Sequence, residues 1–233
     1  MRHAVLLFAL FLGVTSFNAS AGLKMIPGVV TRVSDGDTIR VQPKPAKSEN
    51  IAIRMIGIDT PELHLPTPDH GVVGQGYWGE AAHQYLDGIT SLGTSVVIES
   101  HGIDKYGRTL GRVYDGRRDV NLAMVKSGWA YPYIICSGTS CNKGFFKAER
   151  VSAYLKACED ARDAGLGVFN PSNPLRELPM SFRLRMQNRQ PEKYVGDFET
   201  KKLYQPEEYK KVDICKSIFF LTKKEARRAG YAE

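Results

Sequence analysis

The 233-residue sequence has no run of about 20 consecutive apolar residues, the length that a membrane-spanning helix needs. It has no CxxC pair and only five histidines, which disfavours a cysteine-rich zinc site. It also has no internal repeat, which excludes a solenoid. What is present is an ordinary globular composition, because 42% of the residues are hydrophobic and can form a buried core.

The first 21 residues have the pattern of a removable export signal. Arg2 and His3 give a short basic start, residues 4–14 are apolar, and residues 19–21 form the small-residue cleavage pattern Ala-Ser-Ala. We therefore expect an exported protein, periplasmic or secreted, whose mature form has no membrane anchor. An uncleaved anchor is the alternative, whereas a lipid anchor is not expected because no cysteine stands near the cleavage pattern.

Positive charge is concentrated near the C-terminus. The net charge is +7, and residues 1–21 contribute one basic residue to it. Residues 22–170 contain 17 Lys and Arg against 16 Asp and Glu, whereas residues 171–233 contain 14 against 9. The chain also becomes irregular and proline-rich after Phe169, so we divide it into a body, residues 22–170, and a basic C-terminal extension, residues 171–233. A basic excess attracts nucleic acids, but it also serves solubility.

Four cysteines in an exported chain allow two disulfides, with three ways of pairing them. We favour Cys136 with Cys141, which closes a short loop, and Cys158 with Cys215, which joins the extension to the body. A zinc site is the alternative.

Strand and helix patterns alternate along the body. Extended patterns cover residues 28–41, with a turn at Asp35-Gly36-Asp37, and residues 51–58, 94–99 and 109–114. Helical spacing covers residues 77–89, 119–127 and 145–164, and the proline- and glycine-rich residues 63–76 predict a long surface loop. Five short strands with two or three helices predict an α+β, mainly β fold built on a small closed barrel.

Three polar clusters lie at ends of the predicted strands: residues 35–38 (Asp-Gly-Asp-Thr), Arg54 with residues 59–62 (Asp-Thr-Pro-Glu), and residues 104–108 (Asp-Lys-Tyr-Gly-Arg). Each alone has an ordinary explanation as a hairpin turn, a strand stop or a solvated turn. Their joint occurrence indicates one site, because side chains at strand ends can converge over one end of a barrel.

The order and spacing of these clusters resemble the staphylococcal nuclease (thermonuclease) family over roughly residues 28–169. The family signatures DGDT, RxxGIDTPE and DKYGR stand at residues 35–38, 54–62 and 104–108, and Val120-Asn121 with residues 128–130 match the motif that follows them. The resemblance implies a five-stranded OB-type barrel with packed helices. It also implies hydrolysis of DNA and RNA that depends on a divalent cation, expected to be calcium, with magnesium as the alternative.

Phosphodiester hydrolysis needs an activated water and a polarised phosphoryl group. By the resemblance, Asp37, Asp59 and the backbone carbonyl of Thr60 are expected to ligate the metal, and Glu62 is expected to position or deprotonate the attacking water. Calcium takes about 6 to 8 oxygen ligands, so waters and a substrate phosphate must complete the shell. Asp35 is either an outer member of this carboxylate group or only a turn residue.

Two arginines are expected to bind the phosphate, because a guanidinium presents paired donors and keeps its charge. The expected phosphate ligands are Arg54 and Arg108. Lys105 and Tyr106 match residues that flank the bound nucleotide in the family. Tyr131 or Tyr133 could stack on a base, although packing explains a tyrosine equally well.

Two regions bear on substrate preference and not on the reaction. These are residues 63–76, which contain His64 and His70, and the segment with Cys136 and Cys141.

Residues 195–231 resemble a small ββα module that is appended to some exported nucleases. We expect that module to hold no metal, because Cys215 is its only candidate ligand.

Three other functions stay open at this stage: a catalytically inactive module that only binds nucleic acid, an enzyme for small phosphodiesters, and an extracellular structural domain. The presence of Asp37, Arg54, Asp59, Glu62 and Arg108 together favours the nuclease. We expect the mature protein to be a monomer with DNA and RNA as substrates.

Overall fold

The structure is a computed structural model that describes residues 24–45, 49–136 and 147–233. The predicted signal peptide and Cys141 lie outside these residues. Within the described ranges, no helix has both the length and the apolar character needed to cross a membrane.

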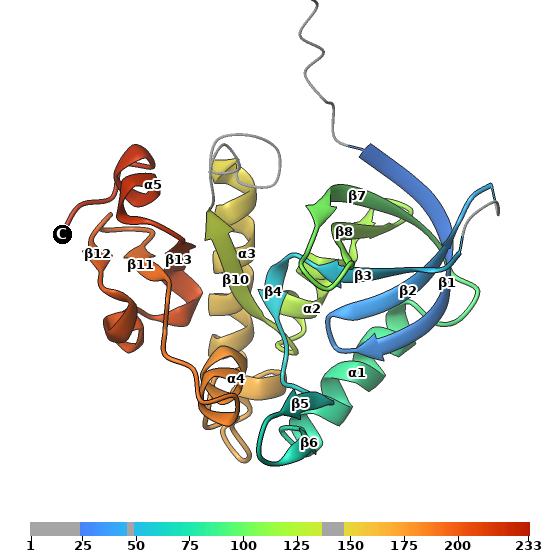
Figure 1. The fold of residues 1–233 in the computed structure, drawn as a ribbon, viewed down its shortest axis with the longest axis horizontal. Coiled ribbons are helices and arrows are strands. Elements are labelled where there is room, and N and C mark those ends of the chain that lie inside the picture. The colour runs from blue at the N-terminus through green and yellow to red at the C-terminus, as the bar shows by residue number, and fades with distance from the viewer. Residues whose placement is uncertain (1–23, 46–48, 137–146) are drawn as a thin grey trace, which may run out of the picture.

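Five strands close a small barrel, seen on the right in Figure 1. The order around the barrel is β3-β2-β1-β7-β8, and a parallel pairing of β3 with β8 closes it. The bounds are β1 (Lys24–Asp35), β2 (Thr38–Pro43), β3 (Ile51–Met55), β7 (Ser95–Ile103) and β8 (Thr109–Asp115), and β9 (Arg118–Asp119) pairs with the end of β8. The predicted closed, five-stranded, OB-type α+β fold is confirmed.

Alternation along the strands explains why the barrel closes. Ile39 and Val41 of β2 are fully buried, whereas Arg40 between them is exposed, as expected when successive side chains point to opposite faces. Ile53 and Met55 of β3 repeat this spacing. Burial of each such side chain stabilises the folded state by about 1.5 to 3 kcal/mol. A shift of one residue in the strand register would expose the whole set to water.

Three helices pack around the barrel: α1 (Tyr77–Ile89), α2 (Val120–Lys126) and α3 (Ala148–Asp163). They lie within the three ranges that the helical spacing predicts. The Asp119 carboxylate caps α2 by accepting a hydrogen bond from the Leu122 N–H at 3.0 Å.

A second sheet, in the order β12-β11-β13-β10-β4, joins the body to the extension. Strand β10 lies between β13 and β4, and it runs antiparallel to β4 of the body and parallel to β13 of the extension. The bounds are β4 (Gly57–Asp59), β10 (Tyr131–Cys136), β11 (Tyr194–Asp197), β12 (Leu203–Tyr204) and β13 (Ser217–Phe220).

The expected boundary near Asn170 marks no break in packing. Leu203, Ile218 and Phe220 of the extension belong to the same buried hydrophobic cluster as the barrel residues. The predicted disulfide between Cys158 of α3 and Cys215 of the extension is present. The second predicted disulfide involves Cys141, which lies outside the described residues; Cys136 is buried at the end of β10.

The extension also carries helices α4 (Pro179–Met186) and α5 (Lys223–Arg228). A short 3-10 turn at Gly167–Phe169 precedes the extension, and two more, at Pro206–Lys211 and Ile214–Lys216, lie within it. The sequence has no clear signal for α4, which is short and whose four buried residues, 179–182, are consecutive and so follow no helical spacing. The segment predicted as a loop, residues 63–76, contains the hairpin of β5 (Leu65–Thr67) and β6 (Gly71–Val73). Strands of three residues are too short to show a periodic pattern.

Candidate active site

The turn between β1 and β2 places Asp35 and Asp37 beside the loop after β4. Gly36 allows this close approach, because a Cβ at that position would lie 2.8 Å from Thr60 Oγ1. Asp35 Oδ1 accepts a hydrogen bond from the Gly36 N–H at 2.7 Å, so Asp35 has the turn role that the sequence left open. Its carboxylate also lines the cleft described below together with Asp37.

Arg54 joins the first two sequence clusters. β2 and β3 pair so that Thr38 lies opposite Arg54. Arg54 Nη1 lies 2.6 Å from Asp37 Oδ2, and Arg54 Nη2 lies 3.4 Å from Asp59 Oδ1. Residues far apart in the chain therefore converge at one end of the barrel, as their positions at strand ends predict.

A third guanidinium, which the sequence reasoning missed, enters the same group from the extension. Arg183 of α4 places Nη1 2.6 Å from Asp59 Oδ1 and 2.5 Å from Glu62 Oε1. These partners are separated from it by 124 and 121 residues. No local pattern could have identified Arg183 among the several arginines of the extension. We call these six residues the cleft cluster: Asp35, Asp37, Arg54, Asp59, Glu62 and Arg183.

Burial, reinforced by neighbouring negative charges, raises the pKa of two acids in the cleft cluster. Burial raises the pKa of Asp35 to about 7, and the charges of Asp37 and Glu62 add to this effect. Burial also raises the pKa of Glu62; the Arg183 charge partly offsets this, while Asp37 and Asp59 raise the pKa further. The cluster therefore holds a surplus of negative charge.

The surplus fits a divalent cation. Four carboxylates face two arginines in the cleft cluster, which leaves two negative charges when all four acids are ionised. Asp59 is 2% exposed, and its Oδ2 has no hydrogen-bond partner among the described residues. Such a buried oxygen is a suitable ligand for a hard cation.

The donor set is nevertheless sparse. Within residues 24–45, 49–136 and 147–233, no group of three or more His, Cys, Asp or Glu side chains is arranged to hold a metal ion. The expected set has only two carboxylates, Asp37 and Asp59, together with one backbone carbonyl, that of Thr60. These residues fit a weakly bound cation whose remaining ligands come from water and substrate.

The third sequence cluster forms a tight turn before β8. Asp104 accepts hydrogen bonds from the backbone N–H groups of Tyr106 and Arg108, both at 2.9 Å, and its other oxygen accepts one from Arg108 Nε at 2.7 Å. Gly107 has a φ of 79°, which favours glycine at this position. The turn therefore holds Arg108 in place while Lys105 and Tyr106 project from it, with Tyr106 70% exposed.

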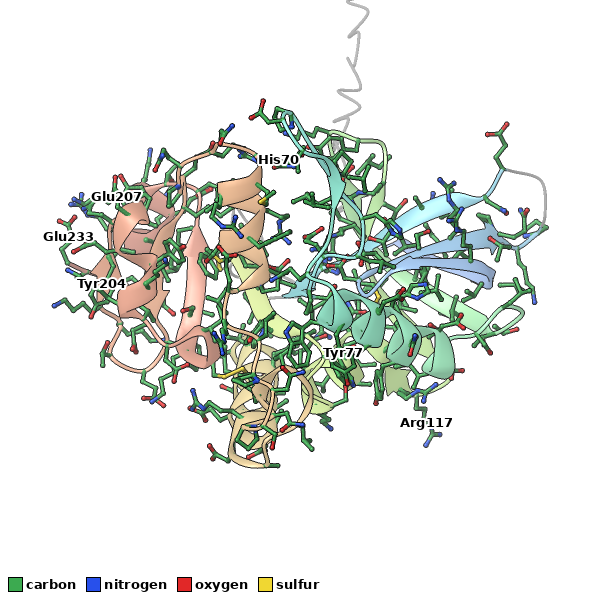
Figure 2. All side chains as sticks on the ribbon, turned by 90° about the horizontal axis from the view of Figure 1, so that it is seen from below. His70, Tyr77, Arg117, Tyr204, Glu207 and Glu233 are labelled. Carbon is green, nitrogen blue, oxygen red and sulfur yellow. A yellow bond between two sulfur atoms is a disulfide. The ribbon has the colours of Figure 1, made fainter. Side chains whose placement is uncertain are left out.

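The body and the extension together enclose a cleft of about 740 Å³. One wall carries Asp35, Asp37, Arg54, Glu62, Lys105, Tyr106 and Arg108; the other carries Arg183, Arg189, Lys193, Tyr209 and Phe219. His64 also lines the cleft, whereas His70 lies at the outer tip of the β5–β6 hairpin (Figure 2). Tyr204, Glu207 and Glu233 lie at the far edge of the extension in the same view.

The structure corrects one predicted substrate contact. Tyr131 is only 4% exposed, packs edge-on against Phe169 with ring centroids 5.3 Å apart, and is not among the cleft residues. This contact buries the ring, so it offers no face on which a base could stack. Tyr133, two residues along on the same strand, lines the cleft, but its ring packs against Phe219 at 4.9 Å.

A model of the staphylococcal nuclease homologue family matches residues 52–170, more than half of the chain. The chain belongs to the staphylococcal nuclease family. This membership supports a nuclease, and the family match ends where the extension begins. The barrel, the three signatures and the cleft cluster are therefore features of a staphylococcal nuclease homologue that carries an added C-terminal segment.

Several relatives share this family. The chain is 33% identical to Endonuclease YhcR of Bacillus subtilis over 88% of the chain and 16% of that protein. It is 31% identical to an uncharacterized endonuclease of Haemophilus influenzae over 75% of the chain and 83% of that protein. It is 32% identical to the probable endonuclease LCL3 of Uncinocarpus reesii over 68% of the chain and 58% of that protein. An alignment over 88% of the chain reaches past residue 170, so the similarity to the Bacillus protein includes part of the extension.

Proposed function

We propose that this chain is a metal-dependent endonuclease that hydrolyses phosphodiester bonds in DNA and RNA. The observation that carries the proposal is the convergence of five cluster residues and Arg108 in a single cleft, with Asp59 buried and paired with the two cleft arginines of the cluster. Family membership and the names of the relatives agree with it. An inactive binding module would have no need for a buried surplus of carboxylates, which is unfavourable for both stability and anion binding.

Asp37, Asp59 and the Thr60 carbonyl would hold the cation, with calcium proposed and magnesium as the alternative. A bound divalent cation polarises the phosphoryl group and stabilises the negative charge that develops on it. Asp59 Oδ2 is the carboxylate oxygen that is ready for this role, since both arginines contact Oδ1.

Glu62 positions the attacking water and accepts its proton. Its carboxylate lines the cleft, and its raised pKa brings it closer to neutrality, where a general base is most effective. Arg54 of β3 and Arg108 of the turn before β8 both line the cleft and bind the phosphate oxygens. Both stay charged throughout the reaction, so they stabilise the transition state without exchanging a proton.

The test is to incubate the purified mature protein with circular DNA, linear DNA and RNA in calcium, magnesium or EDTA. We expect loss of circular DNA that EDTA abolishes, because an endonuclease needs no free end. Retained binding of nucleic acid with no cleavage under any metal would identify a binding module instead. Cleavage of only small phosphodiesters would identify the other enzymatic alternative.

We further propose that the protein is exported and acts as a monomer. The Cys158–Cys215 disulfide agrees with an oxidising compartment, where such bonds persist. Mass spectrometry of the protein recovered from the periplasm or the medium should find an N-terminus at Gly22. Recovery of an uncleaved chain from the membrane fraction would instead support the anchor.

A further inference from the structure

Arg183 contacts two acids to which the proposed reaction gives different tasks. Its Nη1 bridges Asp59 Oδ1 and Glu62 Oε1, at 2.6 and 2.5 Å. In the described part of the chain, no other cationic side chain pairs with the Glu62 carboxylate. Hydrogen bonds of a guanidinium to carboxylates are short and directional, so this bridge sets the orientation of both groups.

A second contact ties the same loop to the extension through the backbone. The Glu62 N–H donates to Gln75 Oε1 at 3.1 Å, and Gln75 Nε2 donates to the Glu177 carbonyl at 2.9 Å. The Gln75 N–H also donates to the Glu62 carbonyl at 2.7 Å. Both the backbone and the carboxylate of Glu62 are therefore held, directly or through Gln75, by residues 177–183.

The extension fixes the position of α4, which carries Arg183. Met180 is buried in a hydrophobic cluster with Val195, Val212 and Phe219, and the Ser181 and Tyr209 hydroxyls are 2.8 Å apart. The Arg183 side chain is 23% exposed, so little room remains for other orientations. A rigid element thus presents the guanidinium, which favours precise placement of its partners.

The bridge leaves the proposed cation ligand available. Arg54 and Arg183 both contact Oδ1 of Asp59, whereas Oδ2 is buried without a partner among the described residues. If Arg183 only took the place of the cation, its guanidinium would be expected to contact Oδ2, the oxygen that is proposed as the metal ligand. The contact is therefore that of a group that orients Asp59 and not of one that blocks it.

We propose that Arg183 is a positioning residue, supplied by the C-terminal extension, that holds Asp59 and Glu62 in the orientation needed for phosphodiester hydrolysis. This proposal rests on the proposed nuclease function. It assigns the extension a part in the active site itself, so the barrel alone would be an incomplete enzyme.

The experiment compares the full chain with Arg183→Met, Arg183→Lys and Arg185→Met. Arg185 is the matched control, because it lies on the same helix but is 59% exposed and pairs with Glu177 at the surface. We expect Arg183→Met to lower kcat about 100-fold, the loss that misplacement by about 1 Å can cause. KM should stay within about twofold, because Arg183 acts through the two acids and not by binding substrate.

A second readout is independent of the metal. The affinity for a fluorescein-labelled single-stranded oligonucleotide in EDTA, followed by anisotropy, should be the same in the wild type and in Arg183→Met. Arg183→Lys keeps the charge but loses the guanidinium geometry, so its kcat should fall about tenfold. If Arg183→Met does not fold, Arg183→Lys tests the proposal in its place. Arg185→Met should match the wild type in every assay.

Three results would overturn the proposal. Weaker oligonucleotide binding with normal kcat would make Arg183 a substrate ligand, and higher activity of the variants at limiting calcium would make it a competing cation. Wild-type kcat in both Arg183 variants would leave it only a structural role. The wild type in the same assay tests the proposed function separately: if it cleaves no nucleic acid with any metal, the nuclease proposal fails, whatever the variants do.

Discussion

The described residues include two groups of buried acids and arginines, one with a surplus of negative charge and the other balanced. The cleft cluster has four acids and two arginines, and three of the acids, Asp37, Asp59 and Glu62, pair with the arginines. The second group, which we call the barrel cluster, lies between β7, β8 and α3 and consists of Glu99, Arg112, Asp119 and Arg150. Its two acids face two arginines and also accept hydrogen bonds from His101, Tyr114 and Tyr154.

The balance of acids and arginines distinguishes a cluster that is suited to catalysis from one that is suited to stabilising the fold. In the barrel cluster, burial acts to raise the pKa of Glu99, but the charges of Arg112 and Arg150 and two hydrogen bonds outweigh it and hold that pKa below its usual value. In the cleft cluster, the pKa values of Asp35 and Glu62 are raised. Asp119 of the barrel cluster is the exception, because burial raises its pKa against the opposing effects of the Leu122 N–H and Arg112. A surplus of negative charge together with raised pKa values is typical of a site where a cation or a proton is handled.

The largest expected effect is on catalysis. Glu62→Gln should lower kcat about 1,000-fold, because an amide cannot accept the proton of the attacking water. Its melting temperature should equal or exceed that of the wild type, since the change removes surplus negative charge. Steady-state cleavage kinetics and a thermal scan measure the two effects. A variant with near-normal turnover would exclude Glu62 as the base.

The converse change is expected in the barrel cluster. Glu99→Gln should reduce the free energy of unfolding by about 3 kcal/mol, because it leaves the Arg112 guanidinium, 1% exposed, with less countercharge. Urea denaturation measures this loss. Activity per folded molecule should not change, and a selective loss of kcat would show that the two clusters are coupled.

Replacing a phosphate-binding arginine should give a somewhat smaller effect. Arg54→Lys and Arg108→Lys each keep the charge but lose the two-point geometry, which should lower kcat/KM about 100-fold with the fold intact. Circular dichroism checks the fold in both variants. Either arginine leaves the proposed mechanism if its lysine variant cleaves DNA at the wild-type rate.

The last contrast is in the pH dependence of stability without metal, where Asp35 and Glu99 should contribute slopes of opposite sign. The folded pKa of Asp35 is raised from 3.8 to about 7, so the folded state binds the proton more tightly and loses stability as pH rises through that window. The folded pKa of Glu99 lies below its usual 4.5, so its stabilisation is present above that pH and is lost as pH falls through the folded value.

Each pKa unit of difference is worth about 1.4 kcal/mol at full effect. Melting curves in EDTA at pH 3 to 8 for Asp35→Asn and Glu99→Gln measure the two contributions. Asp35→Asn should flatten the decline between pH 4 and 7, and Glu99→Gln should flatten the decline below pH 4.5. Unchanged slopes in both variants would contradict the pKa directions on which the contrast depends.

Local patterns predicted most of the body. Alternation at Ile39 and Val41 indicates a strand that is buried on one face, and the residues Asp35-Gly36-Asp37 indicate the turn beside it. Tyr131 could not be placed in the same way, because a tyrosine in a strand is equally compatible with a cleft or a core. Only the tertiary packing of its ring against Phe169 decides for the core.

The amino-acid sequence by itself predicted the barrel, the helices α1 to α3, the family and most of the acids proposed for the site, because each strand, helix and signature is a pattern within a short segment of chain. Only the tertiary structure decided that the extension shares the active site, through Arg183 of α4 and its contacts with Asp59 and Glu62. The physical reason is that an ion pair acts through space over a few ångströms, while its two partners here are separated by more than 120 residues of chain.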